Sequence, residues 1–383
     1  MKKAYIGAGI MNQNGIFQDN AVLLIKDAHI EAVTDGGHIP EGYEQVNVKG
    51  KYITPGLIDV HTHLGVHEEG IGPQGADFNE TSQAVTPAVR ALDGIHPLEE
   101  GFELARRSGV TTVQILPGSA NVIGGEMVIV KTSGSVVDEM VLQSPSGMKA
   151  AFGENPKRIH SNKSSGPVTR MGNAALFREA MIKAQNYRDK CKKDPKAPRD
   201  LGMEQLVSLL ENRIPLRAHA HRADDIATVV RLAEEFDLRY TIEHCTEGHL
   251  IADFLARHQV TASVGPTMST KSKAELSNKS WKTLSALDEH GVDYCITTDH
   301  PVVGIDHLLT SAMMAHKEGL SEAKALSSIT AFAARHLGME ETKGSLEKTK
   351  DADFVIWSHH PFDVKSLVEQ TFIEGRQVYS RDV

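Results

Sequence analysis

Cysteine is scarce in this chain and long hydrophobic runs are missing. The 383 residues include three cysteines, Cys191, Cys245 and Cys295, none of them in C-x-x-C spacing. That count excludes a disulfide framework and favours a reducing compartment. No stretch of about 18 consecutive apolar residues occurs, so we expect no membrane-spanning segment. Because no apolar signal core follows Met1, we expect a cytoplasmic protein.

Positive charge is not in excess. The formal net charge of −9 at pH 7 argues against nucleic acid or an anionic membrane as a general partner. The basic run from Lys183 to Arg199 contains one aromatic residue, Tyr187, so we interpret it as a solvated helix end and loop. A small-molecule substrate is the partner that we expect, and a homo-oligomer is expected on general grounds only.

Two common catalytic motifs are missing as well. No Gly-x-Ser-x-Gly sequence indicates a serine nucleophile. The glycine-rich segment from Gly118 to Gly125 lacks the Gly-Lys-Ser/Thr ending of a phosphate-binding loop. We therefore predict a loop at the edge of a substrate site here, with Asn121 as a candidate substrate contact.

Length and patterning predict a large domain and a smaller one. The first 54 residues and the last 40 or so contain short β segments, such as Ala21–Ile25 and Ala352–Trp357. Because the termini of a domain often lie close together, these segments can pair into one sheet. We expect residues 1–54 and 345–383 to form a composite β-sandwich, and residues 55–344 to form the catalytic domain.

The middle of the chain alternates strand-like and helical runs, which favours βα units. Eight candidate strands are Leu57–Val60, Thr111–Leu116, Met127–Lys131, Met148–Gly153, Pro215–His219, Tyr240–Glu243, Val260–Val264 and Val292–Thr298. Helical patterning covers Pro97–Arg107, Ala174–Ala184, Met203–Glu211, Ala223–Glu235, Leu284–His290 and Gly304–His316. We predict an α/β fold, a (β/α)₈ barrel of eight parallel strands with its site at their carboxyl ends.

Polar clusters follow four of these strands. In the first, the apolar run Leu57–Val60 leads into His61-Thr62-His63, and side chains two apart share one face of a strand. Two neutral imidazoles on one face can bind a divalent metal. The other three clusters are His219-Ala220-His221, Glu243-His244-Cys245-Thr246-Glu247 and Thr297-Thr298-Asp299-His300-Pro301.

The sequence from Pro55 to His63 and the order of the four clusters resemble the amidohydrolase superfamily, near its imidazolonepropionase-like and prolidase-like branch. The resemblance extends over nearly the whole chain, including the terminal β segments. It implies one or two divalent metal ions, most often zinc. The implied ligands are His61, His63, His219, His244 and Asp299.

The sequence leaves open which residue near the fourth strand would complete a two-metal site. Many members use a carboxylated lysine or a glutamate there. We favour Glu154, which lies at the rim, over Lys149, which lies early in the strand. Glu126 is a third candidate.

Two further assignments depend on position alone. His219 fits the family pattern as the ligand, whereas His221 would lie nearer to solvent and contact substrate. The polar insert from Asn155 to Arg170 could form a lid, in which Arg158 or Arg170 clamps a substrate carboxylate.

The reaction that the resemblance implies is hydrolysis of a C–N bond in an amide or cyclic amide by metal-activated water. Asp299 would act as general base and acid, with His244 assisting. A deaminase is an alternative, although His219-Ala220-His221-Arg222 lacks the glutamate of the usual His-x-x-Glu motif. A non-catalytic binding protein is a third reading, but such relatives typically lose ligands.

Overall fold

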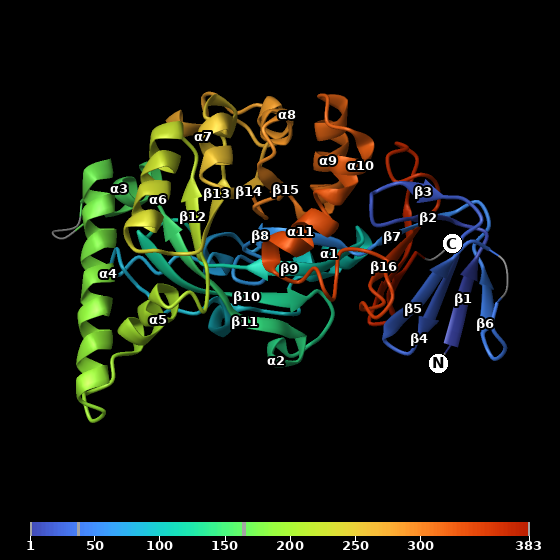
Figure 1. The fold of residues 1–383 in the computed structure, drawn as a ribbon, viewed down its shortest axis with the longest axis horizontal. Helices are drawn as coiled ribbons and strands as arrows, with labels where there is room; N and C mark the ends of the chain where they lie inside the picture. Colours follow the sequence, from blue (N-terminus) through green and yellow to red (C-terminus); the bar gives the residue numbers. More distant parts are fainter. Residues whose placement is uncertain (1, 37–38, 163–165, 382–383) are drawn as a thin grey trace.

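The computed structural model describes residues 2–36, 39–162 and 166–381. Figure 1 shows an α/β barrel in the middle of the molecule, the long helix α4 at one end, and sheets from both chain termini at the other. The N-terminal strand β1 and the marked C-terminus lie on the same side of the molecule.

Eight strands form the barrel sheet, in chain order from β8 to β15. They are β8 (Leu57–Thr62), β9 (Val110–Ile115), β10 (Ile123–Lys131), β11 (Val141–Ala151), β12 (Leu216–Ala220), β13 (Tyr240–His244), β14 (Thr261–Val264) and β15 (Asp293–Ile296). A parallel bridge between Thr62 and His300 brings the first strand against the segment that follows the last. The barrel predicted from the sequence is confirmed.

One strand corrects the prediction of eight parallel strands. β10 pairs antiparallel with both β9 and β11. Residues 116–122 alone join β9 to β10, and a parallel connection needs about a dozen residues or more. The chain therefore turns back as a hairpin, and the glycine-rich loop lies at the same barrel rim as the predicted clusters.

Helices pack around the barrel, and α6 shows why they form. Its apolar residues Ile226, Val229, Val230 and Ala233 recur at helical spacing and are all buried. The other helices are α1 (Glu100–Arg107), α2 (Val137–Met140), α3 (Glu154–His160), α4 (Arg170–Lys193), α5 (Leu201–Leu210), α6 (Ala223–Glu235), α7 (Ala252–Arg257), α8 (Lys282–Glu289), α9 (Leu308–Lys317), α10 (Glu322–Ser327) and α11 (Ala331–Leu337). Within the described ranges, no helix is both long and apolar enough to cross a membrane.

The chain termini build two further sheets. One has the order β5-β4-β1-β6, from β1 (Lys2–Ile6), β4 (Val22–Lys26), β5 (His29–Thr34) and β6 (Glu44–Asn47). The other has the order β18-β17-β16-β7-β2-β3, from β2 (Gly9–Met11), β3 (Phe17–Gln18), β7 (Tyr52–Pro55), β16 (Phe354–Trp357), β17 (Val368–Ile373) and β18 (Arg376–Ser380). The antiparallel pairing of β7 with β16 joins the two ends of the chain, and a shared apolar cluster packs the sheets together.

Gly56 connects this sheet to the barrel. A Cβ atom at position 56 would lie 2.1 Å from Oγ1 of Thr111, so only glycine lets β8 start this close to β9. Gly56 thus fixes the N-terminal end of β8, the strand that leads into the His-x-His sequence.

Candidate metal centre and active site

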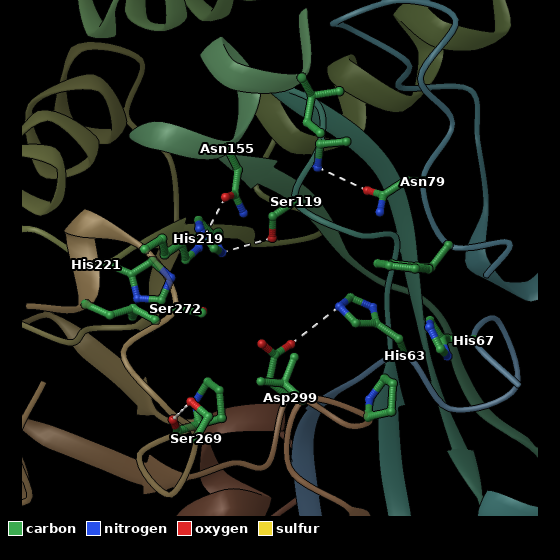
Figure 2. Close-up of a pocket in the computed structure, with 18 of the residues that line it drawn as sticks. His63, His67, Asn79, Ser119, Asn155, His219, His221, Ser269, Ser272 and Asp299 are labelled. Atoms are coloured by element: carbon green, nitrogen blue, oxygen red, sulfur yellow. Dashed lines mark hydrogen bonds and ion pairs between the residues drawn. The ribbon is translucent and has the colours of Figure 1, made fainter. Parts of the chain in front are cut away.

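The His-x-His sequence places two imidazoles beside one carboxylate. His61 lies within β8, and His63 follows one residue beyond its end. The Nε2 atoms of both lie 3.4 Å from Oδ1 of Asp299, which follows β15. Figure 2 shows His63 and Asp299 facing each other across the site.

Every histidine of the four clusters that faces this centre is held through its Nδ1 atom. The partners of Nδ1 are Glu243 Oε2 for His61 (2.9 Å), the Leu116 carbonyl for His63 (2.9 Å), Ser119 Oγ for His219 (2.9 Å), Thr246 Oγ1 for His221 (2.7 Å) and the Gly265 carbonyl for His244 (2.8 Å). Such partners fix the ring orientation, and carboxylate or carbonyl partners keep the proton on Nδ1. The Nε2 atoms are thereby left as ligand atoms.

Burial favours the neutral form of four of these imidazoles, those of His61, His219, His221 and His244, and the neutral form is the one that binds a metal. It lowers the pKa of His61 to about 3 and holds the pKa values of His219 and His221 well below their ordinary range. The pKa of His244 is also lowered, first by burial. The described residues offer Nε2 of His219 and Nε2 of His244 no hydrogen-bond partner.

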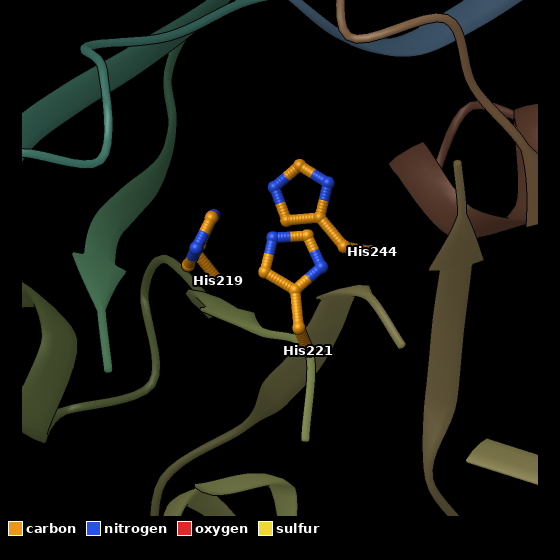
Figure 3. Close-up of side chains that lie close together, drawn as sticks. All are labelled: His219, His221 and His244. Atoms are coloured by element: carbon orange, nitrogen blue, oxygen red, sulfur yellow. The ribbon is translucent and has the colours of Figure 1, made fainter. Parts of the chain in front are cut away.

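Two groups of potential ligands result, and they share His244. One contains His61, His244 and Asp299, and the other contains His219, His221 and His244. Within each group the ligand atoms lie within 4.8 Å of one another. Figure 3 shows the three rings of the second group gathered around one point. Buried, unpartnered imidazole nitrogens beside a carboxylate are the donor set that a divalent metal requires.

Asp299 is held in place from β8. It has a left-handed backbone (φ 55°), and the preceding Thr297 and Thr298 donate hydrogen bonds to the buried carboxylate of Asp59 at 2.5–3.1 Å. Burial would raise the pKa of the Asp299 carboxyl, but His244, His63 and His61 hold it below its ordinary value. Asp299 is therefore an ionised carboxylate at neutral pH.

The three candidates for the bridging position lie in different places. Lys149 is fully buried, and its Nζ atom lies 3.4 Å from Nε2 of His61. Burial lowers the pKa of Lys149 to about 8, with Asp299 and Glu243 opposing the shift. Glu154 begins α3 and belongs to neither ligand group, and the charges that act on Glu126 are Arg90 and Asp93. The geometry thus brings Lys149, and neither glutamate, against the histidines.

A cavity of about 390 Å³ opens at this rim (Figure 2). The residues that line it include His63, His219, His221 and Asp299, and also the two cationic side chains of Arg158 and Lys273. Residues 163–165 of the predicted lid insert lie outside the described residues.

Arg170 and Asn121, which the sequence predicts as substrate contacts, form hydrogen bonds with other protein groups. Arg170 donates from Nε to both oxygens of the buried Asp225 carboxylate, at 2.9 and 3.0 Å. Asn121 is buried and bonds to Glu80, Thr86 and His160. Neither residue is among those that line the cavity, and their predicted roles as substrate contacts stay predictions.

Sequence reasoning did not single out three buried carboxylates of the site. Asp59 stands two residues before His61 on the same strand face, a spacing that could have indicated it. Glu243 adjoins His244 in one of the clusters, but its contact with His61 spans 182 positions of sequence. Glu275 lies in the short 3-10 helix Ala274–Leu276 after β14, where no sequence motif indicates a site residue.

The fold and the ligand set define the chain as a barrel protein whose rim can hold a divalent metal. A model of the amidohydrolase family matches residues 168–379. A solved amidohydrolase structure from Thermotoga maritima MSB8 is 38% identical, with a TM-score of 0.96 over 99% of this chain and 100% of that one. The chain belongs to the amidohydrolase family and is a hydrolase that acts on carbon–nitrogen bonds.

Two curated relatives support the same placement. An imidazolonepropionase from Pseudomonas fluorescens is 28% identical over 380 residues, which covers 88% of each chain. Amidohydrolase tasK from Hapsidospora irregularis is 30% identical over 367 residues, and the match covers 88% of this chain but 37% of that protein. The resemblance inferred from the motifs is confirmed at the level of the superfamily and its imidazolonepropionase-like branch.

Proposed function

We propose that this protein is a metal-dependent hydrolase that cleaves the C–N bond of an amide or cyclic amide bearing a carboxylate group. The observation that best supports the proposal is the position of the Asp299 carboxylate. Its Oδ1 atom lies 3.4 Å from the Nε2 atoms of both His61 and His63, and Asp299 lines the cavity.

The residues that would hold a metal ion are His61, His63, His244 and Asp299, with Lys149 against His61. We propose zinc, because neutral imidazoles and a carboxylate suit it. When bound, such an ion polarises a carbonyl group and lowers the pKa of water towards about 7. A Lys149 amine with a pKa of about 8 is partly neutral at physiological pH, and the neutral amine is the form that could be carboxylated.

Asp299 moves the proton in this proposal. As a carboxylate it accepts the proton of the attacking water, and as the resulting acid it donates that proton to the leaving nitrogen. The imidazoles of His61 and His244 beside it carry no charge at neutral pH, because burial lowers their pKa values.

The charge on the cavity wall supports a carboxylate-bearing substrate. Asp299 is the one acidic residue among the described residues that line the cavity, whereas Arg158 and Lys273 are both cationic. Lys273 contacts Glu275, but the described part of the chain offers Arg158 no carboxylate partner. Arg158, which lines the cavity, is therefore the side chain best suited to bind a substrate anion.

A substrate panel tests the proposal. Protein loaded with Zn²⁺ is assayed against N-acyl amino acids, dipeptides and carboxylate-bearing cyclic amides, each beside its neutral methyl ester or amide. We expect hydrolysis of the carboxylate forms, a loss of about 10²–10⁴-fold in kcat for Asp299→Asn, and a higher KM for Arg158→Ala. Release of ammonia from heterocyclic amines in place of amide cleavage would overturn the proposal in favour of a deaminase.

We also propose that the protein acts in the cytoplasm. The support is chemical: Cys191, Cys245 and Cys295 are all free thiols, as is usual for a protein in a reducing compartment.

A further inference from the structure

Ser119 lies in the loop that joins β9 to β10, and it lines the cavity. Its Oγ atom is 2.9 Å from Nδ1 of His219, and Figure 2 shows the two side chains facing each other. Within the described residues this is the one hydrogen bond of the Ser119 side chain. Because a serine hydroxyl has one hydrogen and two lone pairs, the direction of this hydrogen bond decides what else Ser119 can bind.

The proton in this hydrogen bond belongs to His219. A neutral imidazole carries one proton, and a histidine that binds a metal through Nε2 carries it on Nδ1. A proton on Nε2 would have no partner among the described residues, since Oε1 of Glu275 is 3.8 Å away. His219 therefore donates and Ser119 accepts, which leaves the hydroxyl hydrogen of Ser119 free.

Asn79 brings a second free donor to the cavity. Its Oδ1 atom accepts from the backbone N–H of Ala120 at 3.1 Å, so its Nδ2 atom forms the other end of the amide. No residue in the described ranges accepts a hydrogen bond from that Nδ2 atom, and Asn79 lines the cavity. A Cβ atom at position 118 would lie 2.3 Å from Oδ1 of Asn79, so the glycine there permits this close packing.

The loop that carries Ser119 is also joined to α3, the helix of Arg158. Nε2 of His160, at the end of α3, lies 2.8 Å from Oδ1 of Asn121. The cavity is thus lined by the Ser119 hydroxyl, the Asn79 amide and the Arg158 guanidinium, all of which can donate. A group with negative charge and acceptor oxygens alone, such as a carboxylate, suits these donors.

We propose that Ser119 is a substrate-binding residue, whose free hydroxyl hydrogen and the Nδ2 atom of Asn79 both donate to the substrate carboxylate that Arg158 attracts. The inference rests on the proposed function, because it names contacts to that substrate and because the tautomer of His219 follows from its role as a ligand. It gives the glycine-rich loop a contact with substrate through Ser119.

Binding of small carboxylates tests the inference without turnover. N-acetylglycine and glutarate are titrated by calorimetry into zinc-loaded protein of measured zinc content. We expect Ser119→Ala to weaken binding at least about tenfold, because a hydrogen bond to a charged group is lost. Asn79→Asp should weaken it as much, since the carboxylate still accepts from Ala120 but presents a negative oxygen in place of the donor.

Ser269→Ala is the matched control. Ser269 lines the same cavity, but its hydroxyl already donates to the Pro266 carbonyl at 2.8 Å, so the affinity should stay within about twofold of the native value. Thr246→Val controls for lost support of a histidine. Its Oγ1 atom lies 2.7 Å from Nδ1 of His221, yet Thr246 is not among the residues that line the cavity.

The kinetics give a second readout. Ser119→Ala should raise KM for the carboxylate form of a substrate about tenfold or more and leave KM for its methyl ester within about twofold. Native-like affinity in Ser119→Ala, an equal loss in Ser269→Ala or Thr246→Val, or no binding of either carboxylate to the native protein would overturn the inference. Failure of the hydrolase proposal would look different: the carboxylates would bind through Ser119, and no amide would be cleaved.

Discussion

Among the histidines of the centre, His61 alone has a carboxylate on its Nδ1 atom within the described residues. Glu243 is fully buried, and besides His61 it contacts Thr241, Ser263, Arg217 and His336. Burial would raise the pKa of Glu243, but His336 and His61 hold it well below its ordinary value. An anionic partner makes the opposite nitrogen of an imidazole a stronger donor, so Glu243 should raise the metal affinity of His61.

We predict that Glu243→Gln lowers the affinity of the His61 site for metal by about 10–100-fold. The amide keeps the size of the side chain but removes the charge that strengthens His61 as a ligand. Competition with a fluorescent zinc chelator measures the change. Glu99→Gln is the control, since Glu99 is a buried carboxylate that accepts from Gly65 and Gly101. Equal losses in both variants would mean that general destabilisation is the cause.

At the scale of elements, the reversed strand β10 places Ser119 and Ala120 of the preceding loop on the cavity, and helix α4 contacts helix α6. The hairpin between β9 and β10 brings Ser119 to His219. On the other side, Arg170 at the start of α4 bonds to Asp225 in the first turn of α6. The Asp225 side chain is 4% exposed, so the arginine neutralises a buried charge.

We predict that Arg170→Ala lowers the free energy of unfolding by about 1–3 kcal/mol, because it leaves a buried carboxylate without its partner. KM should stay within about twofold of the native value if Arg170 does not bind substrate. Denaturant unfolding and steady-state kinetics measure the two effects.

Arg178→Ala is the matched control on the same two helices. Arg178 bonds to both oxygens of Glu235, but these side chains are 36% and 39% exposed, so the loss should be below about 1 kcal/mol. A rise in KM for Arg170→Ala without a loss of stability would restore the substrate role that the sequence predicts.

For the whole molecule, neutral buried histidines make stability depend on pH. Burial lowers the pKa of His61 to about 3 and that of His300 to about 4. His219, His221, His244 and His336 also have lowered pKa values. In the unfolded chain each would have a pKa of about 6.5, so between that pH and the folded pKa the unfolded state binds more protons.

We therefore predict that the metal-free protein loses stability steadily as the pH falls below about 6.5. Each such histidine contributes up to about 1.4 kcal/mol per pH unit, and for His61 the loss continues to pH 3 or so. Asp59, with a pKa raised to about 6 by burial, acts in the opposite direction between pH 6 and 4, but it is one group against several. Urea unfolding in the presence of chelator at pH 7.5, 6 and 5 measures the trend. Constant stability over this range would contradict it.

The sequence predicted the elements well because their signals are local. The alternation of apolar runs located all eight barrel strands, and helical spacing located the helices from α1 to α9 that it covered. The sequence pattern did not predict the direction of β10, because an apolar run is compatible with both parallel and antiparallel pairing. The short connection from 116 to 122 was the missed signal.

The candidate site was predictable to the same extent. His61, His63, His219, His244 and Asp299 come together because each lies near or just beyond the carboxyl end of a strand of one barrel. The sequence favours Glu154 over Lys149 because Glu154 lies nearer to the carboxyl end of the strand. In the structure, Lys149 lies earlier in the strand but reaches His61 through its long side chain. The roles of Glu154 and Lys149 stay predictions until metal is measured.

The sequence by itself determined the barrel, the composite terminal sheets and the four polar clusters, since periodicity and strand-end position are properties of neighbouring residues. Only the tertiary structure decided which side chains support the histidines. Glu243 lies 182 positions from His61, and Glu275 lies in a short 3-10 helix with no motif. Such contacts arise when the sheet closes, because closure, and no local pattern, brings the interior faces of distant strands within hydrogen-bond distance.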